Sequence, residues 1–375
     1  MKERIWLSPP DITGKELDYI KDAFSSNWIA PIGPHLNKFE ETFESLLGHN
    51  KYTVALNSGT AAIHIALRLL NVGNDDEVIC QTKTFIGSVN PVLYVGAKPI
   101  FVDSELESWN MCPELLDNAI KDRLQKTGKL PKAIIMVCIY GMPYKVEDIH
   151  AVAESYGIPV IEDSAEALGS TYNNRQCGTF GDMSIFSFNG NKIITTSGGG
   201  LLIVNSEAEK TEAIKLSTQY NSNPKDYTHD KIGYNYRLSN VLAGIGLGQL
   251  EQLDEKVAKK QNNYKAYRDA FEEIEAIHLQ PELKGSFSNR WLNCILVDSA
   301  KSKSELMQLF EDNNIEVKSA WKPMHLQPVF KDYPNYTNGI SEDLYNRGIC
   351  LPSGTSLSEE DLNRITNLVT NYYQC

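Results

Sequence analysis

Lys192 is the first residue of this sequence that calls for a chemical explanation. It stands in SFNGNKIITTSGGG (187–200), and no other charged residue occurs between Met183 and Val204. A buried ammonium without a partner costs far more free energy than packing returns. Lys192 is therefore solvated, paired or used in a reaction, and a lysine that buries its stem while its ammonium reaches water is, in isolation, an equally good interpretation.

Three other stretches place binding groups just after predicted strands. The residues Ser58, Gly59 and Thr60 precede an apolar helical segment, and the free N–H groups and positive dipole end of a helix start can hold a phosphate. Asp163 ends the apolar run PVIED, and Phe85 follows the run DEVIC. Each stretch also has a plainer interpretation, namely a helix N-cap, a carboxylate that caps a turn, and a core aromatic.

Taken together, these features suggest one cofactor, pyridoxal 5'-phosphate. Its aldehyde reacts with a lysine, its phosphate suits a helix start, and its flat ring suits an aromatic neighbour. Its ring nitrogen needs an anionic partner to stay protonated, which Asp163 would supply. In a doubly wound sheet such groups meet outside the carboxyl ends of the strands.

The elements that must position these groups follow an alternating pattern. Short apolar runs between helical segments predict an α/β fold with a mostly parallel sheet covered on both faces. The predicted strands lie at 53–57, 76–80, 98–103, 133–141 and 159–165, with two more at 183–188 and 199–206 around the lysine loop. From about Leu238 a helical pattern longer than ~25 residues is long enough to connect two domains. We therefore expect a large domain over 1–254 and a smaller α+β domain over 255–375.

Composition and charge exclude several other classes. The 375 residues, 42% of them hydrophobic, can bury a large core, and a net charge of −12 with scattered Lys and Arg argues against nucleic acid or an anionic membrane as a partner. The start MKERIWLSPPDITGKEL lacks a signal-peptide pattern, and no stretch reaches the ~18–20 apolar residues of a spanning helix, so we expect a cytoplasmic protein. Seven dispersed cysteines without C-x-x-C spacing indicate neither a disulfide framework nor a metal site.

Six ordered motifs make the chain resemble the DegT/DnrJ/EryC1/StrS family of pyridoxal phosphate-dependent sugar aminotransferases. They are NSGTAAIHIAL, TFIGS, IEDSAEALGS, GDMSIFSFNGNKIITTSGGGLL, GYNYRLSNVLAGIGLGQL and ICLPSG, and they span nearly the whole chain. The resemblance implies the aspartate aminotransferase-like fold, fold type I, and a homodimer with shared active sites. Within the family, NGNKIITTSGGG, SNRWLN (288–293) and WKPMHLQ (321–327) most resemble enzymes that aminate C4 of UDP-linked 4-keto-6-deoxy-N-acetylhexosamines in bacillosamine-type pathways.

The resemblance also implies roles for single residues. Lys192 would form the Schiff base and move a proton, Asp163 would pair with the ring nitrogen, and Phe85 would stack on the ring. Glu166 stands where many relatives carry Gln and would lie near the ring hydroxyl. The phosphate would be held by Ser58, Gly59, Thr60, Ser187 and, from a second subunit, Asn235. A lysine bound to the aldehyde carries no free ammonium, which explains its apolar neighbours.

The implied reaction moves an amino group from L-glutamate, which leaves as 2-oxoglutarate, to C4 of UDP-2-acetamido-2,6-dideoxy-4-ketohexose. Candidates for contacts with the sugar, the nucleotide or the donor carboxylate are His325, Arg237, Trp321 and Arg290. Packing beside Trp321 and Pro323 explains His325 equally well, and Trp291 is better explained as a structural residue than as a nucleotide contact.

Three alternatives stay open on the sequence alone. A sister branch of the family dehydrates sugars with a histidine in place of the lysine, and the presence of Lys192 argues against it. A second alternative is a non-catalytic regulatory protein that binds the cofactor or a sugar on the same fold. The third keeps the reaction and changes the substrate to a dTDP-linked 3- or 4-keto hexose.

Overall fold

The computed structural model describes residues 3–12, 14–48, 50–223 and 225–374. Its centre is an eight-stranded sheet in the order β1-β9-β8-β5-β4-β2-β3-β16. The bounds are β1 Tyr52–Leu56, β2 Glu77–Gln81, β3 Lys98–Val102, β4 Ala133–Val137, β5 Val160–Asp163, β8 Met183–Ser187, β9 Gly200–Val204 and β16 Asn335–Tyr336. All pairings are parallel except those of β9, which runs antiparallel to both β1 and β8. The predicted α/β fold with a mostly parallel sheet is confirmed.

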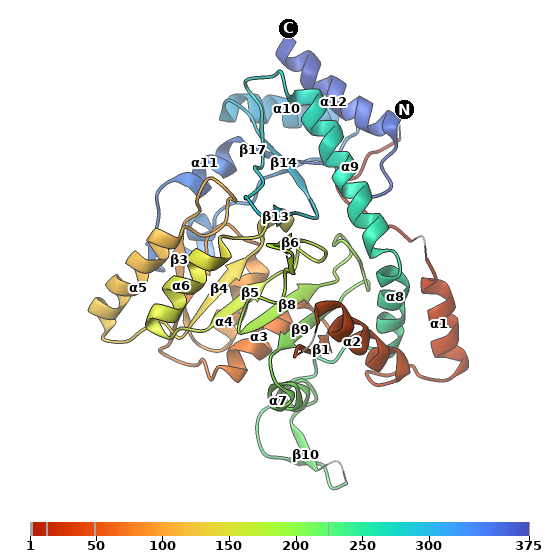
Figure 1. The fold of residues 1–375 in the computed structure, drawn as a ribbon, viewed down its shortest axis with the longest axis vertical. Coiled ribbons are helices and arrows are strands. Elements are labelled where there is room, and N and C mark those ends of the chain that lie inside the picture. Colours follow the sequence, from red (N-terminus) through yellow and green to blue (C-terminus); the bar gives the residue numbers. More distant parts are fainter. Residues whose placement is uncertain (1–2, 13, 49, 224, 375) are drawn as a thin grey trace.

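Helices cover both faces of this sheet, because successive strand side chains point to opposite sides. On β4, for example, Ile135 packs into one apolar core and Ile134 into another. The first core includes side chains of α3 (Gly59–Leu69), α4 (Asn90–Tyr94) and α7 (Glu207–Ser217). The second includes α5 (Pro113–Thr127) and α6 (Val146–Tyr156), and α2 (Pro34–Leu47) covers β1 and β9 in a third core. Figure 1 shows these layers around the central strands.

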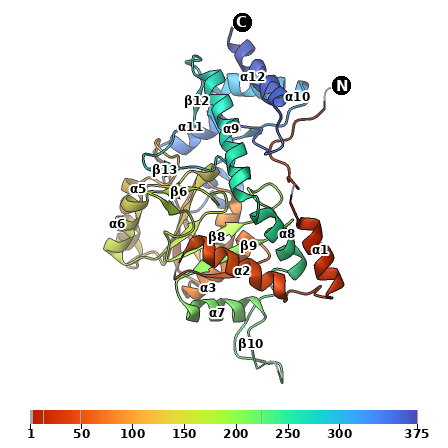
Figure 2. The same ribbon diagram turned by 45° about the vertical axis from the view of Figure 1, so that its right-hand side comes forward.

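The long helical pattern after Leu238 forms two helices, α8 (Asn240–Leu250) and α9 (Leu253–Phe271). α8 packs against α1 (Glu16–Ser25) and α2, beside the large sheet. α9 leads away from this region to the C-terminal elements, as both views show (Figures 1 and 2). The helical pattern breaks at 251–252, and a role for α9 as a connecting helix between two domains stays a prediction.

The C-terminal part builds a four-stranded antiparallel sheet in the order β12-β14-β17-β15. Its elements are β12 His278–Leu279, β14 Asn293–Leu296, β15 Lys318–Ser319, β17 Gly348–Leu351, α10 Ala300–Asp312, α11 Ile340–Arg347 and α12 Glu359–Gln374. Ile5 packs into the core of this part, and β16 joins the large sheet beside β3. The chain therefore crosses between the two regions more than once, and the division at 254/255 stays a prediction.

Short strands complete the fold. The sheet β13-β6-β7 joins Ser286–Phe287 to Thr171–Tyr172 and Arg175–Gln176, and a hairpin joins β10 (Asn221–Asn223) to β11 (Thr228–His229). Among the described residues, no helix has both the length and the apolar character needed to cross a membrane.

Candidate active site

A cavity of about 740 Å³ opens at the carboxyl ends of the central strands. In sheets of this kind, ligands bind where strands end and the chain turns into the next element. Its lining includes most of the predicted site residues, namely Ser58, Gly59, Thr60, Phe85, Asp163, Glu166, Ser187, Lys192 and Trp321. Residues distant in sequence are thus gathered around one volume.

The start of α3 forms the anion-binding end of the cavity. Ser58 caps the helix, and its Oγ accepts a hydrogen bond of 3.0 Å from the N–H of Ala61. The first N–H groups of a helix have no partner within the helix, so those that Ser58 does not bind remain available to a ligand. A Cβ on Gly59 would lie 3.1 Å from Cβ of Ser187, and one on Gly200 would lie 2.3 Å from the backbone of Ser58. Glycine at these positions lets the helix start, β8 and β9 converge.

Asp163 ends β5 and is only 5% exposed. Ser88 donates a hydrogen bond of 2.6 Å to its Oδ2, and the N–H of Ala165 donates one of 3.1 Å to Oδ1. Burial raises the pKa of Asp163, and the hydrogen bond from Ser88 opposes that effect. A cation placed beside this carboxylate would therefore stabilise its ionised form.

Lys192 lies in the loop between β8 and β9, and its side chain is 10% exposed. Its Nζ lies 3.4 Å from Oε1 of Glu166 and 4.1 Å from the centroid of the Trp291 ring. The indole Nε1 of Trp291 donates a hydrogen bond of 2.7 Å to the carbonyl of Asn191, which fixes the ring beside the lysine. The ammonium is thus paired with a carboxylate and an aromatic face.

Glu166 is held by the backbone of Tyr140, whose N–H donates a hydrogen bond of 2.7 Å to Oε2. Tyr140 adopts a left-handed conformation with φ +56°, which is uncommon for a bulky residue. Burial raises the pKa of Glu166 to about 7, and the charge of Lys192 opposes that effect. Near neutral pH this carboxyl group can either accept a proton or donate one.

An aromatic wall faces the carboxylates and the lysine. Phe85 is 60% exposed, and its ring centroid lies 5.8 Å from that of Trp321. Trp321 in turn contacts Tyr140 and Trp291, with ring centroids 5.3 and 6.0 Å away. A largely exposed phenylalanine beside fixed aromatic rings suits a planar ligand.

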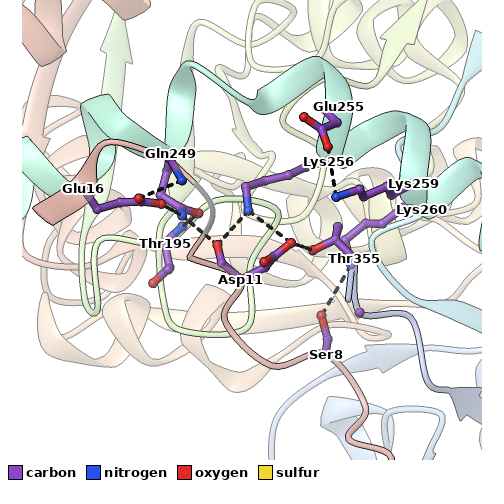
Figure 3. Close-up of polar contacts among 12 residues, drawn as sticks. Ser8, Asp11, Glu16, Thr195, Gln249, Glu255, Lys256, Lys259, Lys260 and Thr355 are labelled. Atoms are coloured by element: carbon purple, nitrogen blue, oxygen red, sulfur yellow. Dashed lines mark hydrogen bonds and ion pairs between the residues drawn. The ribbon is translucent and has the colours of Figure 1, made fainter. Parts of the chain in front are cut away.

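The N-terminal segment forms another wall, which the sequence did not predict. Residues 6–10 line the cavity, and side chains of two distant segments bind the next residue, Asp11. Lys256 on α9 donates a hydrogen bond of 2.8 Å to the Asp11 carbonyl, and Thr355 donates one of 2.6 Å to its carboxylate. Figure 3 shows these contacts together with that of Lys260 to Ser8.

Four of the predicted residues do not line this cavity. Three are occupied elsewhere: His325 contacts Thr82 and Glu342, Arg237 pairs with Glu40 at 2.7 Å, and Arg290 is buried between Glu282 and the ring of Tyr264. The fourth, Asn235, lies near the rim, where its carbonyl accepts a hydrogen bond of 3.5 Å from Asn57. Ligand contacts for these four within the same chain therefore gain no support from the geometry.

The donor set fits pyridoxal phosphate. The helix start with the hydroxyls of Thr60 and Ser187 suits a dianionic phosphate, and the buried carboxylate of Asp163 suits a protonated ring nitrogen. Lys192 supplies an amine in the same cavity, and Phe85 supplies a flat surface. Each functional group of the cofactor thus has a chemical counterpart among the lining residues.

Comparisons with known proteins agree with this chemistry. Residues 10–370 match the DegT/DnrJ/EryC1/StrS aminotransferase family. The chain is 46% identical over 377 residues to the putative pyridoxal phosphate-dependent aminotransferase EpsN of Bacillus subtilis, covering 100% of this chain and 97% of that protein. It is 39% identical to GDP-perosamine synthase of Escherichia coli O157:H7, covering 97% of each.

A solved structure shares the fold over almost the whole length. The PLP-form of the putative sugar aminotransferase Spr1654 from Streptococcus pneumoniae superposes with a TM-score of 0.91 at 28% identity, covering 99% of both chains. The PMP-form of the same protein gives a TM-score of 0.92. Fold, family and cavity chemistry therefore agree.

Proposed function

Because the chain belongs to the DegT/DnrJ/EryC1/StrS family and is a pyridoxal phosphate-dependent sugar aminotransferase, we propose that it transfers the amino group of L-glutamate to C4 of a UDP-linked 4-keto-6-deoxy sugar. The proposed acceptor is UDP-2-acetamido-2,6-dideoxy-4-ketohexose. The observation that carries the reaction type is the meeting of Lys192, Glu166 and Asp163 in one cavity.

Bound pyridoxal phosphate supplies an aldehyde that carries the amino group and a ring that withdraws electrons from the reacting carbon. Lys192 holds the cofactor between turnovers and moves a proton at its Nζ to and from the reacting carbon. Asp163, positioned by Ser88, keeps the ring nitrogen protonated. Glu166, 3.4 Å from Lys192, balances the charge of the ammonium while that group is free.

The donor and the acceptor use the same cavity in turn. Glutamate gives up its amino group and leaves as 2-oxoglutarate before the keto sugar enters, so ping-pong kinetics are expected. A cavity of about 740 Å³ is of the size that holds a cofactor and one organic substrate.

Resemblance of three segments favours a UDP-linked acceptor. NGNKIITTSGGG, SNRWLN and WKPMHLQ are most similar to the enzymes that aminate UDP-linked 4-keto-6-deoxy-N-acetylhexosamines. A GDP-linked keto sugar is the second candidate, because three relatives at 39, 33 and 32% identity are named GDP-perosamine synthase.

A homodimer with shared active sites is part of the proposal. Asn235 would serve the cofactor phosphate of the second subunit, which accounts for its place outside the cavity of its own chain. Large apolar side chains lie exposed near the N-terminus at Phe24, Trp28, Ile29 and Ile32, and such a group is typical of a surface that another subunit covers. The hairpin β10-β11 projects from the body beyond the large sheet (Figures 1 and 2).

Mass spectrometry of single reactions tests the substrate. The cofactor-loaded protein and L-glutamate are combined with UDP-, GDP- and dTDP-linked 4-keto-6-deoxy sugars in separate tubes. We expect glutamate-dependent conversion of the ketone to a primary amine, fastest with the UDP-linked N-acetyl sugar. Faster conversion of the GDP-linked sugar would replace the first candidate by the second.

A further inference from the structure

Two buried thiols meet at the wall of the cavity. Cys294 on β14 lies directly opposite Cys350 on the antiparallel strand β17, with 3.9 Å between the two Sγ atoms. Cys350 also lines the active-site cavity, although both side chains are at most 2% exposed. Opposite residues of an antiparallel pair have Cα atoms ~4.5–5.5 Å apart, within the ~4.4–6.8 Å that a disulfide spans. Rotation of the side chains alone can therefore bring the sulfurs into bonding distance.

A buried lysine, Lys83, interacts electrostatically with both thiols. Lys83 is 0% exposed, and among the described residues its Nζ has no hydrogen-bond partner. Its Nζ also lies 5.8 Å from the ring centroid of Tyr140, which makes a weak cation–π contact. Burial lowers the pKa of Lys83 to about 8, so the amine is still mostly protonated at pH 7. A buried cation of this kind is costly unless an anion compensates it.

Lys303 lowers the pKa of Lys83 further, whereas Cys294, Cys350 and Asp103 raise it. The geometry favours Cys350 as the partner that an oxidant can reach, because it lines the cavity. Its hydrogen bond with Cys294 lowers the pKa of Cys350, and the positive charge of Lys83 lowers it further, against the effect of burial. Tyr140 also lowers that pKa by a hydrogen bond, and Glu166 raises it. Burial raises the pKa of Cys294, and the charge of Lys83 opposes that effect as well. Position distinguishes the two thiols, since Cys350 lines the cavity and Cys294 does not.

We propose that Cys350 is a redox-active thiol that a small hydroperoxide oxidises through the cavity, with Cys294 as the resolving thiol and Lys83 as the cation that stabilises the thiolate. A thiolate, and not a thiol, attacks such oxidants. This modification goes beyond transamination and does not depend on which sugar the enzyme uses.

The proposed oxidation has two steps, oxidation of Cys350 by the hydroperoxide and formation of a disulfide with Cys294. The sulfur of Cys350 attacks one oxygen of the hydroperoxide, an S–O bond forms as the O–O bond breaks, and the departing oxygen takes up a proton and leaves as water or an alcohol. The Cys294 thiol then loses its proton and attacks the oxidised sulfur, so that an S–S bond forms, the S–O bond breaks and water leaves. The two thiols lose two electrons in total, and the peroxide gains them.

The chain contains a second thiol pair that serves as a matched control. Sγ of Cys138 and of Cys177 lie within 4.8 Å of each other, and both side chains are buried. Glu162 lies beside them instead of a lysine; burial raises the pKa of both thiols, and this carboxylate raises it further. Neither cysteine lines the active-site cavity. The second pair is thus close and buried like the first but lacks both the lysine and access to the cavity, so it shows whether proximity alone is enough for oxidation.

The test treats the cofactor-loaded protein with hydrogen peroxide, blocks remaining thiols, and maps peptides without reduction by mass spectrometry. We expect a Cys294–Cys350 disulfide while Cys138 and Cys177 stay reduced. Cys294→Ser should stop at a sulfenic acid on Cys350 that dimedone captures, and Cys350→Ser should leave Cys294 reduced.

Lys83→Met tests the role of the cation, with the visible absorption of the bound cofactor as the check on folding. We expect oxidation to slow by roughly tenfold or more. A rise of about one unit in the pKa of Cys350 would make its thiolate fraction about tenfold smaller and so account for this change. An unchanged rate in Lys83→Met would overturn the role of Lys83. Oxidation of Cys138 and Cys177 as fast as that of Cys294 and Cys350, or no disulfide at all, would overturn the proposal itself.

Discussion

The proposed chemistry depends first on the amine of Lys192. Lys192→Ala removes the group that holds the cofactor and moves the proton, so turnover should fall by roughly 10²–10⁴-fold or more. Borohydride reduction followed by mass spectrometry should fix the cofactor to the wild-type chain and not to the variant. Lys126→Ala, which removes an exposed ion pair on α5, is the control and should behave as wild type. Near-normal turnover in Lys192→Ala would refute the assignment.

The hydrogen bond between Ser88 and Asp163 predicts losses of turnover of different size in two variants. Asp163→Asn keeps the shape of the side chain but removes the charge that keeps the ring nitrogen protonated, and turnover should fall by roughly 10²–10³-fold. Ser88→Ala removes the hydrogen bond of 2.6 Å to Asp163, together with one of 2.7 Å to Thr84, and leaves the charge, so a smaller loss is expected. Steady-state kinetics with unchanged far-UV circular dichroism measures both. A larger loss in Ser88→Ala than in Asp163→Asn would contradict the electrostatic explanation.

The raised pKa of Glu166 predicts a pH dependence of stability in the cofactor-free protein. Between its unfolded value of 4.5 and its folded value of about 7, the folded state binds more protons at this group than the unfolded state does. The contribution of Glu166 to stability is therefore lost as pH rises from about 4.5 to 7 and is constant above that range.

Glu166→Gln should remove this slope and leave the slopes of all other groups in place. The measurement is the difference in urea unfolding free energy between wild type and variant at several pH values. The variant should gain stability relative to wild type as pH rises. A difference that does not change with pH would show that Glu166 keeps an ordinary pKa.

At the level of elements, Lys260 on α9 connects two segments that line the cavity, one at Ser8 and one at Trp291. This side chain is 2% exposed, and its Nζ donates hydrogen bonds of 2.7 Å to the Ser353 carbonyl and 2.9 Å to the Trp291 carbonyl. It also reaches Oγ of Ser8 at 3.4 Å (Figure 3). One lysine thus joins the N-terminal wall, the start of β14 and the loop after β17.

Lys260→Ala should destabilise the protein by roughly 2–5 kcal/mol, because two buried carbonyls lose their donor at ~1–3 kcal/mol each and packing is lost as well. The neighbour Lys259 offers a matched control. It forms an exposed i,i+4 pair with Glu255 at 3.0 Å, so Lys259→Ala should cost about 0.5 kcal/mol or less. Urea unfolding measures both, and equal effects would contradict the fastening role.

The sequence predicted the elements and motifs well for a physical reason. Strand ends and glycine-rich turns are local features, so Asp163, Ser58 and Lys192 could be placed before the structure was known. The contacts that tune these residues are long-range. Trp291 contacts Lys192 although the two residues are 99 positions apart in the sequence, and no local pattern predicts that contact. Ser88 had a weak local signal, since it follows Phe85 by three residues at the same strand end.

Charged candidates near the substrate were harder to judge from sequence. Arg237 and Arg290 look available in a motif, but the fold pairs Arg237 with Glu40 of α2 and Arg290 with Glu282, eight residues earlier in the chain. Whether an arginine is free for a ligand depends on the tertiary partner, which composition and spacing do not reveal. The predicted contacts of these two residues with substrate therefore stay predictions.

At the level of the whole molecule, the prediction to test is that two subunits share their active sites. If Asn235 completes the site of the second subunit, one active site contains Lys192 from one chain and Asn235 from the other. Lys192→Ala and Asn235→Ala homodimers should then each have low activity. A mixed dimer contains one site in which both residues are intact and one site that lacks both. Unfolding and refolding an equal mixture of the two variants should restore about a quarter of wild-type activity, because half of the dimers are mixed and half of their sites are intact.

The same mixture distinguishes the alternative in which Asn235 serves its own chain. In that arrangement every site of the mixed dimer lacks either Lys192 or Asn235, and refolding restores nothing. Refolded wild type, carried through the same steps, sets the reference for recovered activity. A mixture that stays at the level of its parents, while the refolded wild type recovers, would place Asn235 in the site of its own subunit and remove the main argument for shared active sites.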